Sequence, residues 1–301
     1  MPPEGPARAG FPVTPALRPR AQLRVDVGAA THVGKVRERN EDSYLVCRLG
    51  RYLERVSSSL PEALLPPRSE DSGLIMIVAD GMGGMAAGEV ASETALSTMV
   101  RLILDAPRWS LKLAGIENRE AEIEELWERA REFMSAVHAA VRNRADADPS
   151  LSGMGTTLTG AYSLGADLFV THVGDSRAYL CRDGRAQKIT RDHTMAQSFV
   201  EMGVLKEEDA RTHRMRHVLT QAVGGPEDQL EADLHALELA AGDRLLLCSD
   251  GLTNHVDPEE LGEVLSAAGS CQQACDRLLE LALDYGGSDN ITTIVAGYSA
   301  A

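Results

Sequence analysis

An unbroken apolar run at residues 74–79 (LIMIVA) is the strongest pattern in the chain, and half of its residues are β-branched. Such a run is typical of a strand buried on both faces, because a half-exposed strand alternates apolar and polar residues. It ends in Asp80, which a glycine-rich segment, 81–84 (GMGG), separates from a helical pattern beginning near Gly88. We therefore expect Asp80 to lie on a rigid support at the rim of the core, where an ion or a phosphate can approach the backbone.

Alternation with a period of two and helical periodicity predict the remaining elements. Four short runs within residues 158–190, separated by turn signals, indicate an antiparallel meander. Helices from residue 88 and at about 119–142 each carry one apolar stripe and should lie on a sheet, with His138 as a hydrogen-bonded surface residue. Strands are expected at 23–27, 44–49, 74–79, 158–163, 168–173, 177–181, 186–190, 244–249 and 291–297, with capped helices after Asp257 and Ser270 and two short helical patterns inside 191–229.

Two segments differ from this folded pattern. Residues 1–21 hold six of the thirteen prolines together with three arginines, which predicts a disordered Pro/Arg-rich tail. Residues 50–73 contain Pro and Ser between two strand patterns, so we expect a surface insertion there. No internal stretch has the composition of a linker, and the chain is long enough for one large core. We therefore predict a single folded domain over residues 22–301.

The charge balance narrows the range of partners. Thirty Lys and Arg residues against 45 Asp and Glu residues give a net charge of −15, which argues against nucleic acid or an anionic membrane. No apolar stretch approaches the roughly 20 residues that a membrane-spanning helix needs. Five cysteines are an odd number, and no secretory segment is recognisable, so we expect a soluble protein of the reducing cytoplasm. Cys271 and Cys275 share one helical stripe and are predicted to pack rather than to bind metal.

Aspartates recur where the predicted strands end. Converging carboxylates without countercharges repel one another, so they either lie apart or share divalent cations. Oxygen donors with no His or Cys nearby favour Mg²⁺ or Mn²⁺ over Zn²⁺, and two such ions bridged by a carboxylate make a hydroxide nucleophile that can attack a phosphoryl group. Arg37 offers the planar fork that binds phosphate. The recurring aspartates are Asp42, Asp80, Asp175, Asp250 and Asp289.

Other interpretations remain open at this point. Residues 81–86 (GMGGMA) match the G-x-G-x-x-G/A fingerprint of a dinucleotide-dependent oxidoreductase, although the strands of period two argue against a doubly wound sheet. A tight turn in which Asp80 merely caps the helix would also explain the stretch. The basic segment 211–217 (RTHRMRH) is either a solvated face or a guide for an anionic substrate.

Six motifs, in order, make the chain similar to the metal-dependent protein serine/threonine phosphatases of the PPM, or type 2C, family in their bacterial form. The similarity extends from about Leu23 to Ala296. It implies an α+β fold, a four-layer α-β-β-α sandwich of two mainly antiparallel sheets flanked by helices, with metals in a cleft at one end of the strands. It also implies that residues 191–229 are a flap that varies with substrate. The motifs are 37–42 (RERNED), 78–84 (VADGMGG), 153–157 (GMGTT), 173–177 (VGDSR), 249–251 (SDG) and 288–290 (SDN).

The resemblance also assigns roles to individual residues. It implies two tightly bound Mg²⁺ or Mn²⁺ ions and a third, weaker one, with Arg37 at the phosphate. The expected ligands are Asp80 as the bridge between the tight pair, the Gly81 carbonyl for one of them, Asp250 and Asp289 for the first ion, Glu41 and Asp42 for the second, directly or through water, and Asp175 for the third.

The predicted function is hydrolysis of phosphoserine and phosphothreonine in proteins by a metal-bridging hydroxide, without a phosphoenzyme. The resemblance implies phosphorylated proteins as partners, together with the Ser/Thr kinases that the enzyme would oppose, and we expect a monomer. The family commonly has a histidine, a candidate proton donor, at the position of Met85. That difference supports a second hypothesis, a catalytically weakened member of the same fold that binds phosphoproteins.

Overall fold

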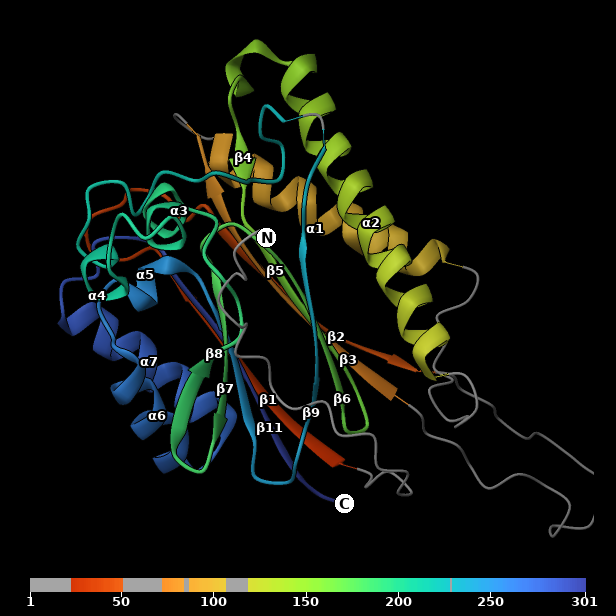
Figure 1. Cartoon of the computed structure of the whole chain (residues 1–301), viewed down its shortest axis with the longest axis vertical. Coiled ribbons are helices and arrows are strands. Elements are labelled where there is room, and N and C mark those ends of the chain that lie inside the picture. Colours follow the sequence, from red (N-terminus) through yellow and green to blue (C-terminus); the bar gives the residue numbers. More distant parts are fainter. Residues whose placement is uncertain (1–22, 51–71, 84–86, 107–118, 228) are drawn as a thin grey trace, which may run out of the picture.

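The structure is a computed structural model that describes residues 23–50, 72–83, 87–106, 119–227 and 229–301. The predicted tail, nearly all of the predicted insertion and Met85 lie outside these ranges. The described elements form four layers, in which two sheets face each other and helices cover both outer sides (Figure 1). The predicted α+β sandwich is therefore confirmed.

Two sheets form the centre of the fold, and every strand pair among the described residues is antiparallel. One sheet has the order β1-β11-β10-β7-β8, and the other has the order β2-β3-β5-β6-β9 with the short β4 paired to β3. The strands are β1 (Leu23–His32), β2 (Asp42–Gly50), β3 (Ser72–Met82), β4 (Gly155–Thr156), β5 (Leu158–Leu164), β6 (Asp167–Val173), β7 (Arg177–Arg182), β8 (Arg185–Lys188), β9 (Asp233–Glu238), β10 (Arg244–Cys248) and β11 (Ile291–Ala300).

Strand β3 shows why the run 74–79 contains no polar residue. Its even-numbered side chains pack between the sheets, in the same cluster as Leu247 of β10 and Ile294 of β11. Its odd-numbered side chains pack beneath the helices on the outer side. Burying a large apolar side chain contributes about 1.5–3 kcal/mol, so this strand anchors two of the three apolar clusters and gives Asp80 a rigid base.

Helices form the outer layers. Helices α1 (Ala87–Asp105) and α2 (Arg119–Ala147) cover the sheet that contains β3, and α6 (Pro258–Ala267) and α7 (Cys271–Asp284) cover the other sheet (Figure 1). Trp127 of α2 meets Phe169 of β6 edge to face, with ring centroids 5.4 Å apart. The shorter helical elements are η3 (Pro149–Leu151), α3 (Met195–Glu201), α4 (Glu207–Ala210) and α5 (Asp250–Thr253).

The predicted starts of α6 and α7 are confirmed. The Asp257 side chain accepts from the backbone N–H of Glu260, whose own side chain accepts from the Asp257 N–H, and Ser270 caps α7 through the Gln273 N–H. Cys271 and Cys275 are buried against the sheet, as the packing interpretation predicts. Across the described residues no helix is both long and apolar enough to span a membrane.

The predicted meander was wrong as a single unit. Strands β5 and β6 pair in one sheet, whereas β7 and β8 pair in the other. Gly174, at φ 108, lies in the β6–β7 connection, where the chain crosses the sandwich instead of returning along the same sheet. Only glycine adopts this backbone conformation readily, so Gly174 allows the chain to change direction at this point.

Two further details differ from the prediction. Strand β9 was not predicted, because none of its side chains is fully buried and its alternation is weak; it pairs with β6 at the edge of the sheet. His138 is buried rather than at the surface. Its hydrogen bonds are nevertheless complete, since Nε2 donates to the Glu227 carbonyl at 3.0 Å and Nδ1 accepts from the Gly224 N–H at 3.2 Å.

Candidate metal centre

Asp42 and Asp80 face each other across the β2–β3 ladder. Asp42 is buried, and its Oδ2 accepts a 2.7 Å hydrogen bond from Ser249 Oγ, which comes from the opposite sheet. Burial raises the pKa of Asp42 to about 7, and the charges of Asp250 and Asp289 add to this increase. Two carboxylates in directly opposed positions of an antiparallel pair are electrostatically unfavourable, so this pair is a feature that a cation would stabilise.

The opposite sheet contributes the next two carboxylates. Asp250 follows β10 at the start of α5, and Asp289 stands two residues before β11, which is the neighbour of β10. Burial raises the pKa of Asp80 well above its ordinary value, and the charges of Asp42, Asp250, Asp175 and Asp289 raise it further. The structure therefore brings all of these predicted residues to one end of the two sheets.

Asp175 belongs to the connection between β6 and β7. Burial raises the pKa of its carboxyl group, and the nearby charge of Asp250 raises it further. The adjoining Ser176 hydroxyl lies 2.7 Å from Thr157 Oγ1, which in turn accepts from the Asp80 N–H at 2.9 Å. The polar residues of the motifs 153–157 and 173–177 thus fix the backbone beside Asp80.

Glu41 occupies the space at the beginning of α1. A Cβ on Gly81 would stand 2.1 Å from the Gly88 carbonyl oxygen, so only glycine fits there, and a Cβ on Gly88 would stand 2.7 Å from the Glu41 carboxyl carbon and displace that side chain. Burial raises the pKa of Glu41, while Arg37 and a hydrogen bond from the Gly88 N–H oppose the change. The Asn290 side chain accepts from the Glu41 N–H at 2.8 Å and so fixes this segment.

Arg37 lies at the same site but is already paired. Its Nη2 donates to Asp289 Oδ2 at 2.8 Å, and about half of the Arg37 side chain is exposed. A guanidinium this close to the carboxylates can reach a phosphoryl group bound beside them. The pairing with Asp289 was not predicted, because the two residues lie at opposite ends of the sequence.

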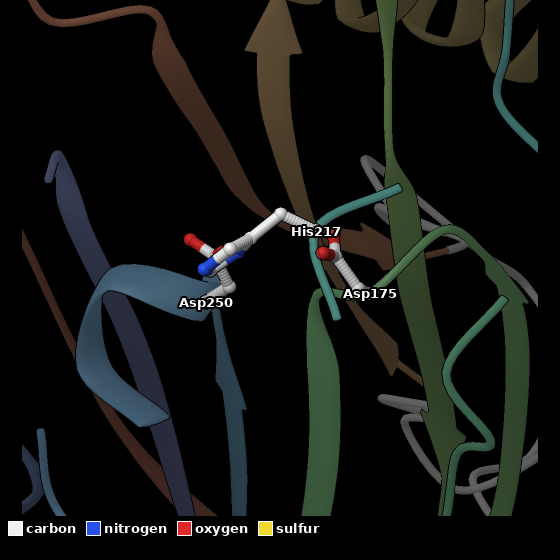
Figure 2. A group of neighbouring side chains, drawn as sticks. All are labelled: Asp175, His217 and Asp250. Carbon is white, nitrogen blue, oxygen red and sulfur yellow. The ribbon is translucent and has the colours of Figure 1, made fainter. Parts of the chain in front are cut away.

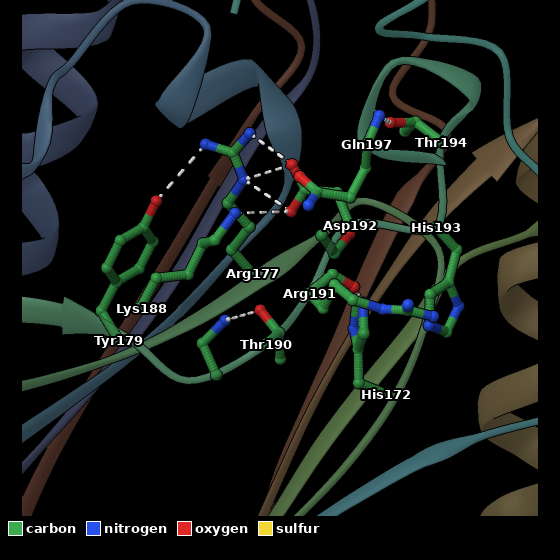
Figure 3. A network of polar contacts seen from close by, with 12 residues as sticks. His172, Arg177, Tyr179, Lys188, Thr190, Arg191, Asp192, His193, Thr194 and Gln197 are labelled. Carbon is green, nitrogen blue, oxygen red and sulfur yellow. Dashed lines mark hydrogen bonds and ion pairs between the residues drawn. The ribbon is translucent and has the colours of Figure 1, made fainter. Parts of the chain in front are cut away.

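A network of polar contacts, most of them buried, joins the first residues of the segment 191–229 to the chain around Asp175 (Figure 3). Arg177 donates from Nε and Nη2 to Asp192, with a shortest distance of 2.7 Å. The ring Nδ1 of His193 accepts from the Gly174 N–H at 3.3 Å, and the backbone N–H of His193 donates to the Gly174 carbonyl at 2.7 Å. Both contacts join the start of the segment 191–229 to the residues on either side of Asp175.

His172 completes this network. It is fully buried, and burial together with the neighbouring His193 lowers its pKa to about 3, so the ring is neutral at physiological pH. Its Nε2 donates to the Arg191 carbonyl at 2.9 Å, and its Nδ1 accepts from Thr159 Oγ1 at 2.9 Å. Because every ring nitrogen is occupied, we assign His172 a structural role.

One histidine reaches the carboxylates, contrary to the prediction that none is near. His217 Nδ1 lies 3.3 Å from Asp250 Oδ2. One ligand atom from each of Asp175, His217 and Asp250 lies within 4.8 Å of the others (Figure 2). In the sequence, His217 stands out only as part of the basic segment 211–217. That segment gives no indication that it lies beside Asp250 in the fold.

The donors suit divalent cations. Asp42 Oδ1 is buried and has no hydrogen-bond partner among the described residues, and a buried unpaired carboxylate oxygen is costly unless a cation or proton compensates it. Oxygen-rich donor sets of this kind match Mg²⁺ and Mn²⁺. The described strands contradict the dinucleotide interpretation, since β3 pairs antiparallel with both β2 and β5, whereas a dinucleotide crevice requires a mostly parallel sheet.

The fold and the site together define a sandwich protein with a carboxylate centre for divalent cations. Residues 65–292 match the family model described as Protein phosphatase 2C, and the chain belongs to this family. It is 39% identical over 246 residues to the serine/threonine protein phosphatase PstP of Mycobacterium tuberculosis, an alignment that covers 80% of the chain and 44% of PstP. The chain thus aligns with less than half the length of that relative.

A second relative is matched over most of its length. The serine/threonine phosphatase stp of Listeria welshimeri is 37% identical over 227 residues, which covers 75% of the chain and 85% of stp. Among solved structures, the catalytic domain of PstP in complex with two manganese ions superimposes with a TM-score of 0.70 at 33% identity and covers 92% of the chain and 99% of that domain. The comparisons and the topology agree on the fold.

Proposed function

We propose that this protein hydrolyses phosphoserine and phosphothreonine in other proteins, with two Mg²⁺ or Mn²⁺ ions bound tightly and a third bound more weakly. The observation that carries the proposal is the convergence of Asp42, Asp80, Asp250 and Asp289 from two facing sheets at one rim. The manganese ions in the PstP structure support the choice of metal.

In this proposal each residue has a distinct task. Asp80 would bind both tightly held ions, with the Gly81 carbonyl as a ligand of one of them. Asp250 and Asp289 would be further ligands of the first ion. Glu41 and Asp42 would bind the second ion, directly or through water. When bound, the ions acidify a shared water to give a nucleophile at neutral pH and neutralise charge on the phosphoryl oxygens.

Arg37 would orient the phosphoryl group. Its guanidinium can donate two parallel hydrogen bonds to phosphoryl oxygens once it leaves Asp289. The rigid strand β3 keeps the bridging carboxylate fixed during the reaction, which reduces the reorganisation that the transition state would otherwise require. Asp175 would hold the third ion.

The biological setting is inferred from the family resemblance. Phosphoproteins produced by bacterial Ser/Thr kinases would be the substrates, and the protein would act as a monomer in the cytoplasm. The five thiols are all unpaired, which agrees with a reducing compartment. The exposed part of the flap, residues 191–229, would meet the substrate protein.

A direct assay tests the proposal. Metal-stripped protein is incubated with p-nitrophenyl phosphate and with a phosphothreonine peptide, with and without Mn²⁺ or Mg²⁺. We expect phosphate release only with metal and its loss on chelation. Full turnover after exhaustive chelation would refute the metal mechanism.

The second hypothesis, a phosphoprotein-binding member without turnover, depends on Met85, which lies outside the described residues. It predicts saturable binding of the phosphothreonine peptide in the presence of Mn²⁺ with no phosphate released. Binding and release measured in the same samples separate the two functions.

A further inference from the structure

His217 places a nitrogen donor at the outer edge of the carboxylate centre. It comes from the flap, whereas Asp175 comes from the β6–β7 connection and Asp250 from the start of α5 (Figure 2). Donors from three separate segments meet only through the tertiary fold. Two carboxylates beside one imidazole also form a donor set of mixed type, unlike the oxygen-only group around Asp80.

The spacing of these atoms matches ligands of one ion. Two donors on a common octahedral ion, with bonds of about 2.1 Å, lie about 3 Å apart when adjacent and about 4.2 Å apart when opposite. The His217 Nδ1 to Asp250 Oδ2 distance is 3.3 Å, which suits adjacent positions. All three ligand atoms lie within 4.8 Å of one another, so small adjustments bring them onto a single cation.

The backbone fixes His217 near this position. The Met195 N–H donates to the Val218 carbonyl and the Thr220 N–H donates to the His193 carbonyl, each at 2.8 Å. These bonds tie the residues directly after His217 to the start of α3. His217 is therefore held beside Asp250 by the fold of the flap, while almost half of its side chain remains accessible.

Arg177 is the cationic side chain to consider beside these carboxylates, and it is hydrogen-bonded to another residue. Arg177 lies close enough to Asp175 to oppose the rise that burial causes in the pKa of that carboxyl group, but its Nε and Nη2 donors are directed to Asp192. A metal ion is thus the natural partner for the two carboxylates that His217 faces.

We infer that His217 is a ligand of the third, outer ion, together with Asp175 and Asp250, so that filling this position fastens the flap to the core. The inference rests on the proposed function in that a metal must bind at the carboxylate centre. A nitrogen donor strengthens binding of Mn²⁺, Co²⁺ or Zn²⁺ more than binding of Mg²⁺. The outer position therefore discriminates between metals, and an ion bound there joins His217 of the flap to the core.

The first test is a calorimetric titration of the metal-stripped full chain with Mn²⁺ and, separately, with Mg²⁺. The variants are His217→Ala and His217→Gln, and the matched control is Arg214→Ala, which removes an exposed side chain from the same segment. Loss of groups that only support ligands already weakens metal binding about 10–100-fold. We expect the weakest Mn²⁺ step to weaken at least tenfold in both His217 variants, with the Mg²⁺ step much less affected.

The second test measures the flap directly. Arg211, Arg214 and Arg216 offer trypsin cleavage sites within the segment. We expect Mn²⁺ at concentrations that fill the outer position to slow cleavage there in the wild type and not in His217→Ala.

Two results would overturn the inference. One is an unchanged third Mn²⁺ step in both His217 variants, and the other is a wild-type titration with only two ions. Neither readout uses turnover, so a protein that binds three ions but releases no phosphate would refute the proposed function and leave the role of His217 intact.

Discussion

Arg37 Nη2 lies 2.8 Å from Asp289 Oδ2 and donates a hydrogen bond to it, so the side chain predicted to bind phosphate is paired with one predicted to bind metal. The two side chains are 52% and 29% exposed, and exposed pairs of this kind contribute little stability. The pair can therefore separate at small cost. After separation, Asp289 would be free to bind a metal ion, and Arg37 would be free to donate hydrogen bonds to a phosphoryl group.

The first prediction concerns Arg37→Lys. An ammonium keeps the charge but cannot donate two parallel hydrogen bonds to one phosphoryl group. We expect KM for a phosphothreonine peptide to rise roughly tenfold, corresponding to about 1.4 kcal/mol, with a smaller change in kcat. Arg39→Lys is the matched control, because the Arg39 side chain is exposed and its ion pair within the described residues is a 3.7 Å contact with Glu89. Equal KM values for the two variants would remove Arg37 from the phosphate site.

The second prediction concerns Asp80→Asn. The backbone of Asp80 is held by Thr157, which donates to its carbonyl and accepts from its N–H, so the substitution should preserve the fold. Turnover should fall on the order of a thousandfold, comparable to the loss of a key charge-stabilising group. Metal titration and thermal unfolding accompany the assay, with Asp183→Asn in the exposed β7–β8 turn as the control. Wild-type turnover in Asp80→Asn would mean that the carboxylates are structural.

The fold and the carboxylate positions could be predicted because their signals are local. The run 74–79 is apolar at every position since β3 is buried on both faces. Asp80 directly follows the apolar run 74–79 within β3, and Asp250 stands two residues after β10, so the end of an apolar run marks the rim of a sheet. Such residues can be recognised from the neighbouring sequence alone, without knowing which distant segments they contact.

The features that escaped prediction depend on long-range packing. The alternation in residues 158–190 does not reveal that β6 and β7 lie in different sheets. A backbone bridge between Thr194 and Leu219 holds the residues that follow His217, and no periodicity in the flap predicts that bridge. The pairing of Arg37 with Asp289 likewise follows from the contact between segments at opposite ends of the chain.

The third prediction concerns the ion pair of Arg177 and Asp192. Both side chains are largely buried, at 24% and 11% exposed. Removing one partner of such a pair leaves the other charge buried without compensation. We expect Asp192→Asn to lower the free energy of unfolding by about 3 kcal/mol, measured by urea denaturation in EDTA. Glu201→Gln, which breaks the exposed pair with Arg191, should cost less than about 1 kcal/mol. Similar losses in the two variants would contradict the prediction.

The last prediction links metal, pH and stability. Asp42 has a pKa of about 7 in the fold, against about 3.9 for an unperturbed aspartate. Between pH 4 and 7 the folded, metal-free protein therefore holds a proton that the unfolded chain has lost. Unfolding releases that proton, so stability falls as pH rises through this window, by up to about 1.4 kcal/mol per pH unit for one proton.

Bound metal should reverse the trend, because it holds the carboxylates ionised and competes with protons. We expect Tm in EDTA to fall from pH 4.5 to pH 7.5, and the rise in Tm on adding Mn²⁺ to be larger at pH 7.5 than at pH 5. Asp42→Asn can still accept from Ser249 Oγ and should make the metal-free profile less steep, with the raised pKa values of Asp80 and Asp175 accounting for the remaining slope, whereas Asp183→Asn should leave the profile unchanged. A Tm increase from Mn²⁺ that is the same at both pH values would show that these carboxylates do not exchange protons for metal.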